Sequence, residues 1–164
     1  MRRTKDAFIW IINILKELSV PFQIAGGFAA RIYGSHRRLA DIDIGVPDND
    51  VGRIFPKVKK YIVYGPKHYI DRNDDLLLMT LRYRDQMIDI YGNDNTKLYD
   101  LKNRKWVPYR LNLKKGTVKN VYGINVPIIS KKKLIEYKKL LMRKVDIEDI
   151  RRLEKSVNKV SKNS

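Results

Sequence analysis

The sequence predicts an α+β fold in which helices pack on a mixed β-sheet. Apolar residues recur at helical spacing near the amino terminus, and a helix-capping serine at position 130 opens a second helical region. Between them, residues 61–128 are rich in β-branched and aromatic residues and are divided by turn-forming residues, which is typical of strands. We expect one domain over residues 1–157 and a frayed basic tail over 158–164.

The first expected element is a helix over residues 4–19, which Pro21 stops. Its apolar residues follow the i, i+3, i+4, i+7 pattern as Phe8, Ile11, Ile12 and Leu15. Further apolar residues broaden this face, namely Ile9, Trp10 and Ile14. The helix could therefore be covered on two sides, or could contact a second copy of the chain in a homodimer.

The elements that follow are short and alternate in type. We expect a strand over 22–25, a turn at Gly26-Gly27, a helix over 28–34 closed by Gly34, a strand over 41–46 and a helix over 48–59. Strand-like segments come next, among them a hairpin around Arg84-Asp85-Gln86 and a strand-like run over 121–129. Helices over 131–142 and 146–157 complete the domain.

Composition and charge limit the possible partners and location. The 164 residues include 35 lysines and arginines against 18 aspartates and glutamates, a formal net charge of +17. Such a surface attracts nucleic acid, nucleotides or anionic lipid, although lysine-rich composition can also be a property of the source organism. There is no cysteine, which excludes disulfides and thiolate metal sites. The amino-terminal apolar run is too short to span a bilayer, so we expect a cytoplasmic protein without a membrane anchor.

Two aspartates lie on one face of the expected strand over 41–46. Side chains alternate along a strand, so Asp41 and Asp43 point to one face while Ile42 and Ile44 point into the core. Neighbouring carboxylates repel each other and raise each other's pKa, so a cation between them is expected. Carboxylate oxygens without histidine or cysteine favour Mg²⁺ or Mn²⁺ over zinc.

A third aspartate has the same surroundings in a later strand. Asp89 lies between Ile88 and Ile90, so it too is an acid on the open face of a strand. If that strand pairs beside residues 41–46, three carboxylates converge. The alternative is that each aspartate is an ordinary solvated strand residue.

The glycine pair ahead of these acids fits a phosphate site. The turn at Gly26 and Gly27 allows close approach of a ligand to the backbone, and the following helix directs free N–H groups at that place. A tight strand–helix turn without a ligand is the simpler interpretation.

The chain resembles the nucleotidyltransferase fold of the DNA polymerase beta superfamily. The resemblance rests on this glycine pair, the short helix, the arginine loop, D-x-D on a strand and a later aspartate. The chain is most similar to the small stand-alone branch that includes lincosamide and aminoglycoside nucleotidyltransferases and the minimal enzymes sometimes labelled MazG-related. The resemblance covers residues 5–155. It implies transfer of NMP from an NTP to an acceptor hydroxyl with release of pyrophosphate.

The resemblance also implies roles for individual residues. Asp41, Asp43 and Asp89 match the metal-binding and catalytic carboxylates, which would hold two Mg²⁺ or Mn²⁺ ions. The residues expected to bind the nucleotide are Gly26, Gly27, Arg37, Arg38, Lys138 and Arg143. Asp146 and Asp149 match structural acids of the final helical segment.

The chain departs from the family pattern at three positions. Gly27 stands where serine is frequent, Leu39 where threonine is frequent and Val145 where lysine is frequent. None of these departures removes an expected metal ligand. They affect the expected substrate more than the expected fold.

Three functions remain open on the sequence alone. The first is a Mg²⁺-dependent nucleotidyltransferase whose acceptor is a small molecule, a protein hydroxyl or an RNA end. The second is a non-catalytic module of the same fold that acts as an antitoxin or nucleic-acid-binding partner, since fold does not fix function. The third treats D-x-D as a nucleotide-sugar motif of a glycosyltransferase, which leaves the glycine pair unexplained.

Overall fold

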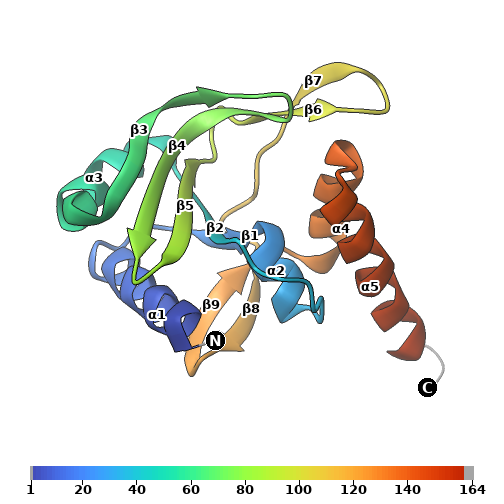
Figure 1. Cartoon of the computed structure of the whole chain (residues 1–164), viewed down its shortest axis with the longest axis horizontal. Helices are drawn as coiled ribbons and strands as arrows, with labels where there is room; N and C mark the ends of the chain where they lie inside the picture. The colour runs from blue at the N-terminus through green and yellow to red at the C-terminus, as the bar shows by residue number, and fades with distance from the viewer. Residues whose placement is uncertain (1, 161–164) are drawn as a thin grey trace.

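A computed structural model describes residues 2–160 and confirms the α+β fold (Figure 1). The helices are α1 Arg2–Glu17, α2 Gly26–Ile32, α3 Asp48–Val58, α4 Lys131–Leu141 and α5 Lys144–Val160, with a 3-10 helix η1 at Lys59–Tyr61. The strands are β1 Gln23–Ala25, β2 Asp41–Val46, β3 Ile62–Ile70, β4 Asp74–Tyr83, β5 Gln86–Gly92, β6 Lys97–Asp100, β7 Lys105–Pro108, β8 Thr117–Val121 and β9 Ile124–Ile128.

All nine strands belong to one mixed sheet. Its order is β7-β6-β4-β5-β2-β1-β9-β8, and β3 pairs with β4 beside this path. The pairs β2–β5 and β1–β9 are parallel, whereas the other pairs are antiparallel. The hairpin expected around Arg84-Asp85-Gln86 joins β4 to β5.

Helices lie on two sides of the sheet (Figure 1). Helices α1 and α3 both contact β5. On the other side of the molecule in this view, α4 and α5 lie together, and α4 contacts both α2 and β6. The carboxyl-terminal helices thereby come close to the segment between β1 and β2.

Helix α1 ends at Glu17, two residues before the expected end. Ser19 adopts a left-handed conformation with φ 53°. The N–H of Val20 donates to the carbonyl of Leu15 and that of Ser19 to the carbonyl of Lys16. This is the hydrogen-bond pattern of a Schellman motif, which satisfies the last carbonyls of a helix.

The structure also differs from the expectations at the β8–β9 turn and at the start of α2. The run over 121–129 is interrupted, because Tyr122 and Gly123 both have positive φ and form the turn between β8 and β9. Helix α2 begins at Gly26 rather than at residue 28, so the glycine pair forms its first turn.

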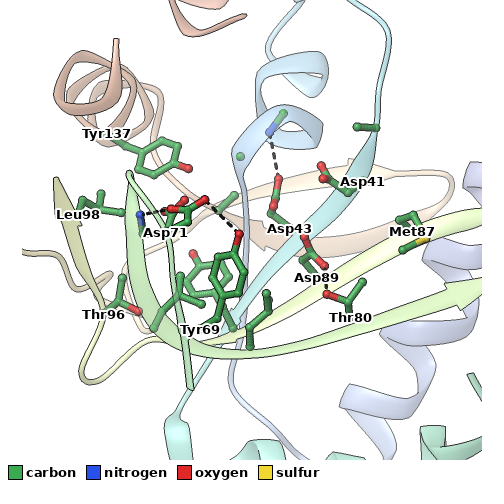
Figure 2. A pocket seen from close by; sticks show the side chains of 18 of the residues that line it. Asp41, Asp43, Tyr69, Asp71, Thr80, Met87, Asp89, Thr96, Leu98 and Tyr137 are labelled. Atoms are coloured by element: carbon green, nitrogen blue, oxygen red, sulfur yellow. Dashed lines mark hydrogen bonds between the residues drawn. The ribbon is translucent and has the colours of Figure 1, made fainter. Parts of the chain in front are cut away.

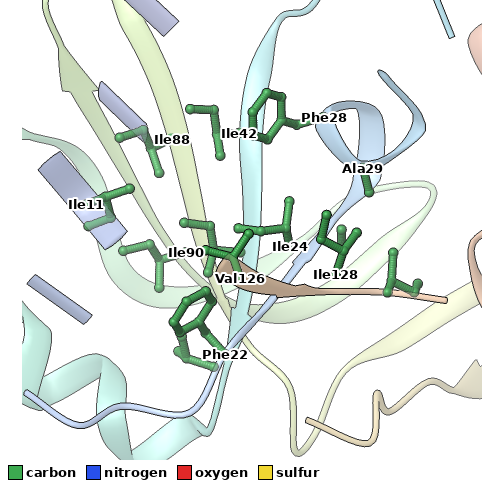
Figure 3. Close-up of a cluster of buried hydrophobic side chains, with 14 of the residues drawn as sticks. Ile11, Phe22, Ile24, Phe28, Ala29, Ile42, Ile88, Ile90, Val126 and Ile128 are labelled. Carbon is green, nitrogen blue, oxygen red and sulfur yellow. The ribbon is translucent and has the colours of Figure 1, made fainter. Parts of the chain in front are cut away.

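The core lies between β2, β5 and the helices that cover them (Figure 3). Side chains from β2, β5, α1 and α2 meet there with no exposed surface or almost none, including Ile11, Phe28, Ile42, Ile88 and Ile90. The broad face of α1 is also occupied within the chain, because Trp10 stacks on Tyr83 with ring centroids 4.5 Å apart. The breadth of this face therefore has an explanation within one copy of the chain.

The described range does not include the whole expected tail. Helix α5 extends to Val160, and residues 161–164 of the tail expected over 158–164 lie outside the described residues. Within residues 2–160, no helix has the length and hydropathy required to cross a membrane.

Replacement of a buried strand isoleucine should test the assignment of the core. Ile90→Ala in β5 removes a fully buried side chain, and we expect it to lower the free energy of unfolding by about 2–5 kcal/mol. Ile70→Ala in β3 is the matched control, because Ile70 is 58% exposed, and should change stability by about 0.5 kcal/mol or less. Urea unfolding measures both, and equal losses would contradict the placement of the core.

Candidate active site

Three carboxylates converge on the open face of the sheet, as Figure 2 shows. Strands β2 and β5 run parallel with Asp43 directly beside Asp89. Asp41 lies two residues earlier on the same face of β2, and neighbouring strands are only about 4.8 Å apart. One carboxylate oxygen from each of Asp41, Asp43 and Asp89 lies within 4.8 Å of the others.

The first turn of α2 packs directly against Asp43. The N–H of Gly27 donates to Oδ2 of Asp43 at 3.2 Å. Gly26 has φ 57°, and a Cβ atom at this position would overlap the Asp43 carboxylate. Glycine is therefore required here because its φ is positive and because the Asp43 carboxylate leaves no space for a side chain.

The electrostatics of the three acids reflect their crowding. Burial and the nearby charges of Asp41 and Asp89 raise the pKa of Asp43 to about 8. Burial also raises the pKa values of Asp41 and Asp89. Without a cation, all three ionised carboxylates together are therefore unfavourable near neutral pH.

A hydroxyl group fixes the third carboxylate. Thr80 of β4 pairs with Asp89 across the sheet, and its Oγ1 donates to Oδ1 of Asp89 at 2.6 Å. This hydrogen bond favours the ionised form of Asp89 and orients its carboxylate.

Two arginines bring positive charge to the same cavity wall. Arg37 is 17% exposed, and its Nε donates to Oδ2 of Asp149 in α5 at 2.9 Å. The Nε of Arg143, the residue before α5, donates to Oδ2 of Asp146 at 2.7 Å. Burial raises the pKa of Asp41, and the positive charges of both guanidinium groups offset part of this rise, so both act on the acid cluster.

The other two expected phosphate ligands lie elsewhere. The Lys138 side chain is 1% exposed, and its Nζ lies 3.1 Å from Asp146 Oδ1 and 2.9 Å from Asp149 Oδ2. Arg38 is exposed. Neither Arg38 nor Lys138 lines the cavity, whereas Gly26, Gly27 and the two arginines do.

The cavity has a volume of about 720 Å³ and extends well beyond the acid triad. Its second half contains two further acids and several tyrosines that no pattern in the sequence assigns to a site, namely Asp71, Asp74, Tyr64, Tyr69, Tyr109 and Tyr137. Figure 2 shows Asp71, Tyr69 and Tyr137 on the side of the cavity opposite the triad. Burial and the neighbouring Asp71 raise the pKa of Asp74 to about 6.

Hydrogen bonding accounts for part of this second half. Tyr69 Oη and two backbone N–H groups donate to Asp71, which thereby shapes the turn between β3 and β4. The Tyr109 hydroxyl is buried without a hydrogen-bond partner among the described residues. A ligand in the cavity could supply that partner, because buried polar groups are rarely left unpaired.

The triad is a suitable donor set for a divalent cation. Its ligand atoms are all carboxylate oxygens, which hard cations such as Mg²⁺ and Mn²⁺ prefer. A bound cation would also relieve the repulsion that raises the three pKa values. The residues present therefore fit the expected metal site.

Comparisons with known proteins give the same fold. No protein-family model and no curated protein sequence matches the chain. Among solved structures, TM1012 of Thermotoga maritima, a protein proposed to be a nucleotidyltransferase, is similar with TM-score 0.64 and 17% identity over 94% of each chain. The lincosamide antibiotic adenylyltransferase LnuA, solved with lincomycin, has TM-score 0.55 and 17% identity over 90% of this chain and 94% of its own.

A third similar structure is the nucleotidyltransferase ANT(2″)-Ia in complex with adenylyl-2″-tobramycin. It has TM-score 0.61 and 16% identity over 94% of this chain and 89% of its own. Together these structures confirm the nucleotidyltransferase fold of the chain.

The raised pKa of Asp43 predicts how the metal-free protein responds to pH. The folded state holds the proton up to about pH 8, whereas an unfolded aspartate loses it near pH 3.9. The folded state thus binds more protons between these values, so the free energy of unfolding should fall as pH rises from about 4 to 8. Asp43→Asn has no such proton to lose and should flatten this decline.

The measurement is urea unfolding in EDTA at several pH values. Asp85→Asn, which alters an exposed acid in the β4–β5 turn, should keep the wild-type slope. A slope that is identical in the wild type and Asp43→Asn would contradict the electrostatic description of the triad.

Proposed function

We propose that the protein is a Mg²⁺-dependent nucleotidyltransferase that moves NMP from an NTP to a hydroxyl group of a small acceptor molecule, with release of pyrophosphate. The convergence of Asp41, Asp43 and Asp89 beside a large cavity is the observation that carries this proposal. The similarity in fold to LnuA and ANT(2″)-Ia supports the reaction class.

The proposed reaction is an in-line displacement at phosphorus. The acceptor oxygen forms a bond to the α-phosphorus, and the bond from that phosphorus to the pyrophosphate oxygen breaks. Asp89 accepts the proton of the attacking hydroxyl, in the orientation that Thr80 imposes on its carboxylate. Asp41, Asp43 and Asp89 would hold the cations, which when bound offset the negative charge that develops on the phosphate oxygens.

The arginines on the cavity wall would bind the NTP phosphates. Arg37 and Arg143 are both near Asp41, and guanidinium groups form strong, oriented hydrogen bonds to phosphate. Gly26 and Gly27 line the same cavity, and glycine allows a ligand to approach the backbone closely. Arg38 and Lys138 lie off the cavity wall, so neither would contact the phosphates.

The second half of the cavity favours a small, positively charged acceptor. Asp71, Asp74 and the surrounding tyrosines present negative charge and aromatic faces, which attract cations and repel the phosphates of an RNA end. The net charge of +17 had favoured nucleic acid, but five aspartates and only two arginines line this cavity. The ligands of LnuA and ANT(2″)-Ia, lincomycin and adenylyl-2″-tobramycin, are likewise small molecules.

Asp43→Asn should abolish NMP transfer while leaving the fold intact. Loss of this carboxylate weakens both the metal site and transition-state stabilisation, so we expect kcat to fall at least about 100-fold. Transfer of label from an α-labelled NTP, with and without Mg²⁺, measures the effect, and Asp85→Asn serves as the control. Wild-type rates in Asp43→Asn would refute the site.

Asp74→Asn should separate acceptor binding from nucleotide binding. If Asp74 contacts an amine of the acceptor, its loss should raise the KM of amine-bearing hydroxyl acceptors by about 10-fold and leave the KM of the NTP unchanged. The neighbouring Asp75 pairs with His68 and lies outside this cavity, so Asp75→Asn is the matched control. Preference for an RNA oligonucleotide over amine-bearing acceptors would contradict the acceptor assignment.

A further inference from the structure

Asp149 has an unusual set of partners for an acid that lies off the cavity wall. Its side chain in α5 is completely buried. It accepts hydrogen bonds from Ser35 Oγ at 2.6 Å and from Arg37 Nε at 2.9 Å, and Lys138 Nζ lies 2.9 Å away. These contacts lower the pKa of Asp149, so it is ionised at neutral pH.

The contact with Asp149 determines where the Arg37 guanidinium lies. Its Nε is bound to Asp149, and its Nη1 donates to the carbonyl of Arg38 at 3.2 Å. The Nη2 atom is directly against Gly27, where any added Cβ would overlap it. The third nitrogen therefore lies at the cavity wall, beside the glycine whose own N–H is bound to Asp43.

We propose that Asp149 is a positioning residue that fixes Arg37 in place to receive an NTP phosphate. The inference rests on the proposed function, because it assumes that the NTP phosphates lie beside the acid triad. An arginine side chain otherwise loses rotamer entropy when it is immobilised on a ligand. Prior fixation by Asp149 removes part of that cost from nucleotide binding.

The partners of Lys138 explain how Asp149 can remain charged in the interior. Lys138 is buried between Asp146 and Asp149, and a buried charge needs such a counter-ion. Asp146 in turn binds the guanidinium of Arg143. Helix α5 therefore presents two acids that share one lysine, and each holds one arginine of the cavity wall.

The test is a double-mutant cycle on ATP binding. Asp149→Asn, Arg37→Met and the double variant are compared with the wild type by calorimetric titration with ATP and Mg²⁺ and by the KM and kcat of NMP transfer. We expect Asp149→Asn to weaken ATP binding by about 10-fold, with a smaller effect on kcat. If Asp149 acts through Arg37, the double variant binds ATP no more weakly than Arg37→Met alone.

Two controls separate positioning from general stability. Ser35→Ala removes another hydrogen bond to Asp149 but leaves its contact with Arg37, so ATP affinity should stay within about twofold. Arg37→Lys keeps the positive charge but loses the Nε contact with Asp149. In this background, adding Asp149→Asn should leave the ATP affinity unchanged, even if it lowers the Tm.

The outcomes distinguish this inference from the proposed function. Wild-type protein that binds none of ATP, GTP, CTP and UTP with Mg²⁺ would overturn both; if it binds one of the other three instead of ATP, that NTP replaces ATP in the cycle. Two results would overturn the positioning role alone, provided that the wild type binds ATP. One is that the losses of ATP affinity in Asp149→Asn and Arg37→Met add up in the double variant; the other is that folded Asp149→Asn binds ATP as tightly as the wild type.

Discussion

The site depends on the mutual repulsion of three carboxylates that the sheet holds together. The parallel register of β2 and β5 places Asp43 beside Asp89, and neither strand can shift without moving Ile42, Ile44, Ile88 and Ile90 out of the core. Core packing therefore sustains an electrostatic arrangement that is unfavourable by itself. The nearby donors offset it only in part, since the pKa of Asp43 remains about 8 despite the N–H of Gly27. A divalent cation is the natural complement to such a residual charge.

Net charge and site charge have opposite signs in this protein. The chain carries +17 overall, yet acids outnumber bases on the cavity wall. A positive exterior can raise the local concentration of an anionic nucleotide. Which ligand binds inside the cavity depends instead on the charges of the residues that line it. Under the proposed function, Arg37 and Arg143 on the cavity wall would bind the triphosphate of the NTP. Under the proposed function, Asp71 and Asp74 in the second half of the cavity would bind a cationic group of the acceptor.

The sequence predicted the triad because each acid alternates with apolar residues that must be buried. Asp41-Ile42-Asp43 and Ile88-Asp89-Ile90 each orient their acids by strand geometry alone. The pairing of β2 with β5 could only be assumed, since it depends on contacts distant in sequence. The burial of Lys138 and the hydrogen bond from Thr80 to Asp89 could not be predicted for the same reason. Lys138 is buried because two acids of α5 surround it, and no local pattern in α4 indicates this.

Gly27 stands where serine is frequent in the superfamily that the chain resembles, and this difference depends on several other residues of the chain. A serine there would place its Cβ against Nη2 of Arg37. Arg37 occupies that space because Asp149 binds its Nε, and Asp149 tolerates burial because Lys138 lies beside it. Glycine at position 27 is thus part of an arrangement that includes the loop before β2 and both carboxyl-terminal helices. A serine at position 27 would therefore require a different position for Arg37. Under the proposed function, the guanidinium held from α5 would take the place of that serine hydroxyl beside the phosphates.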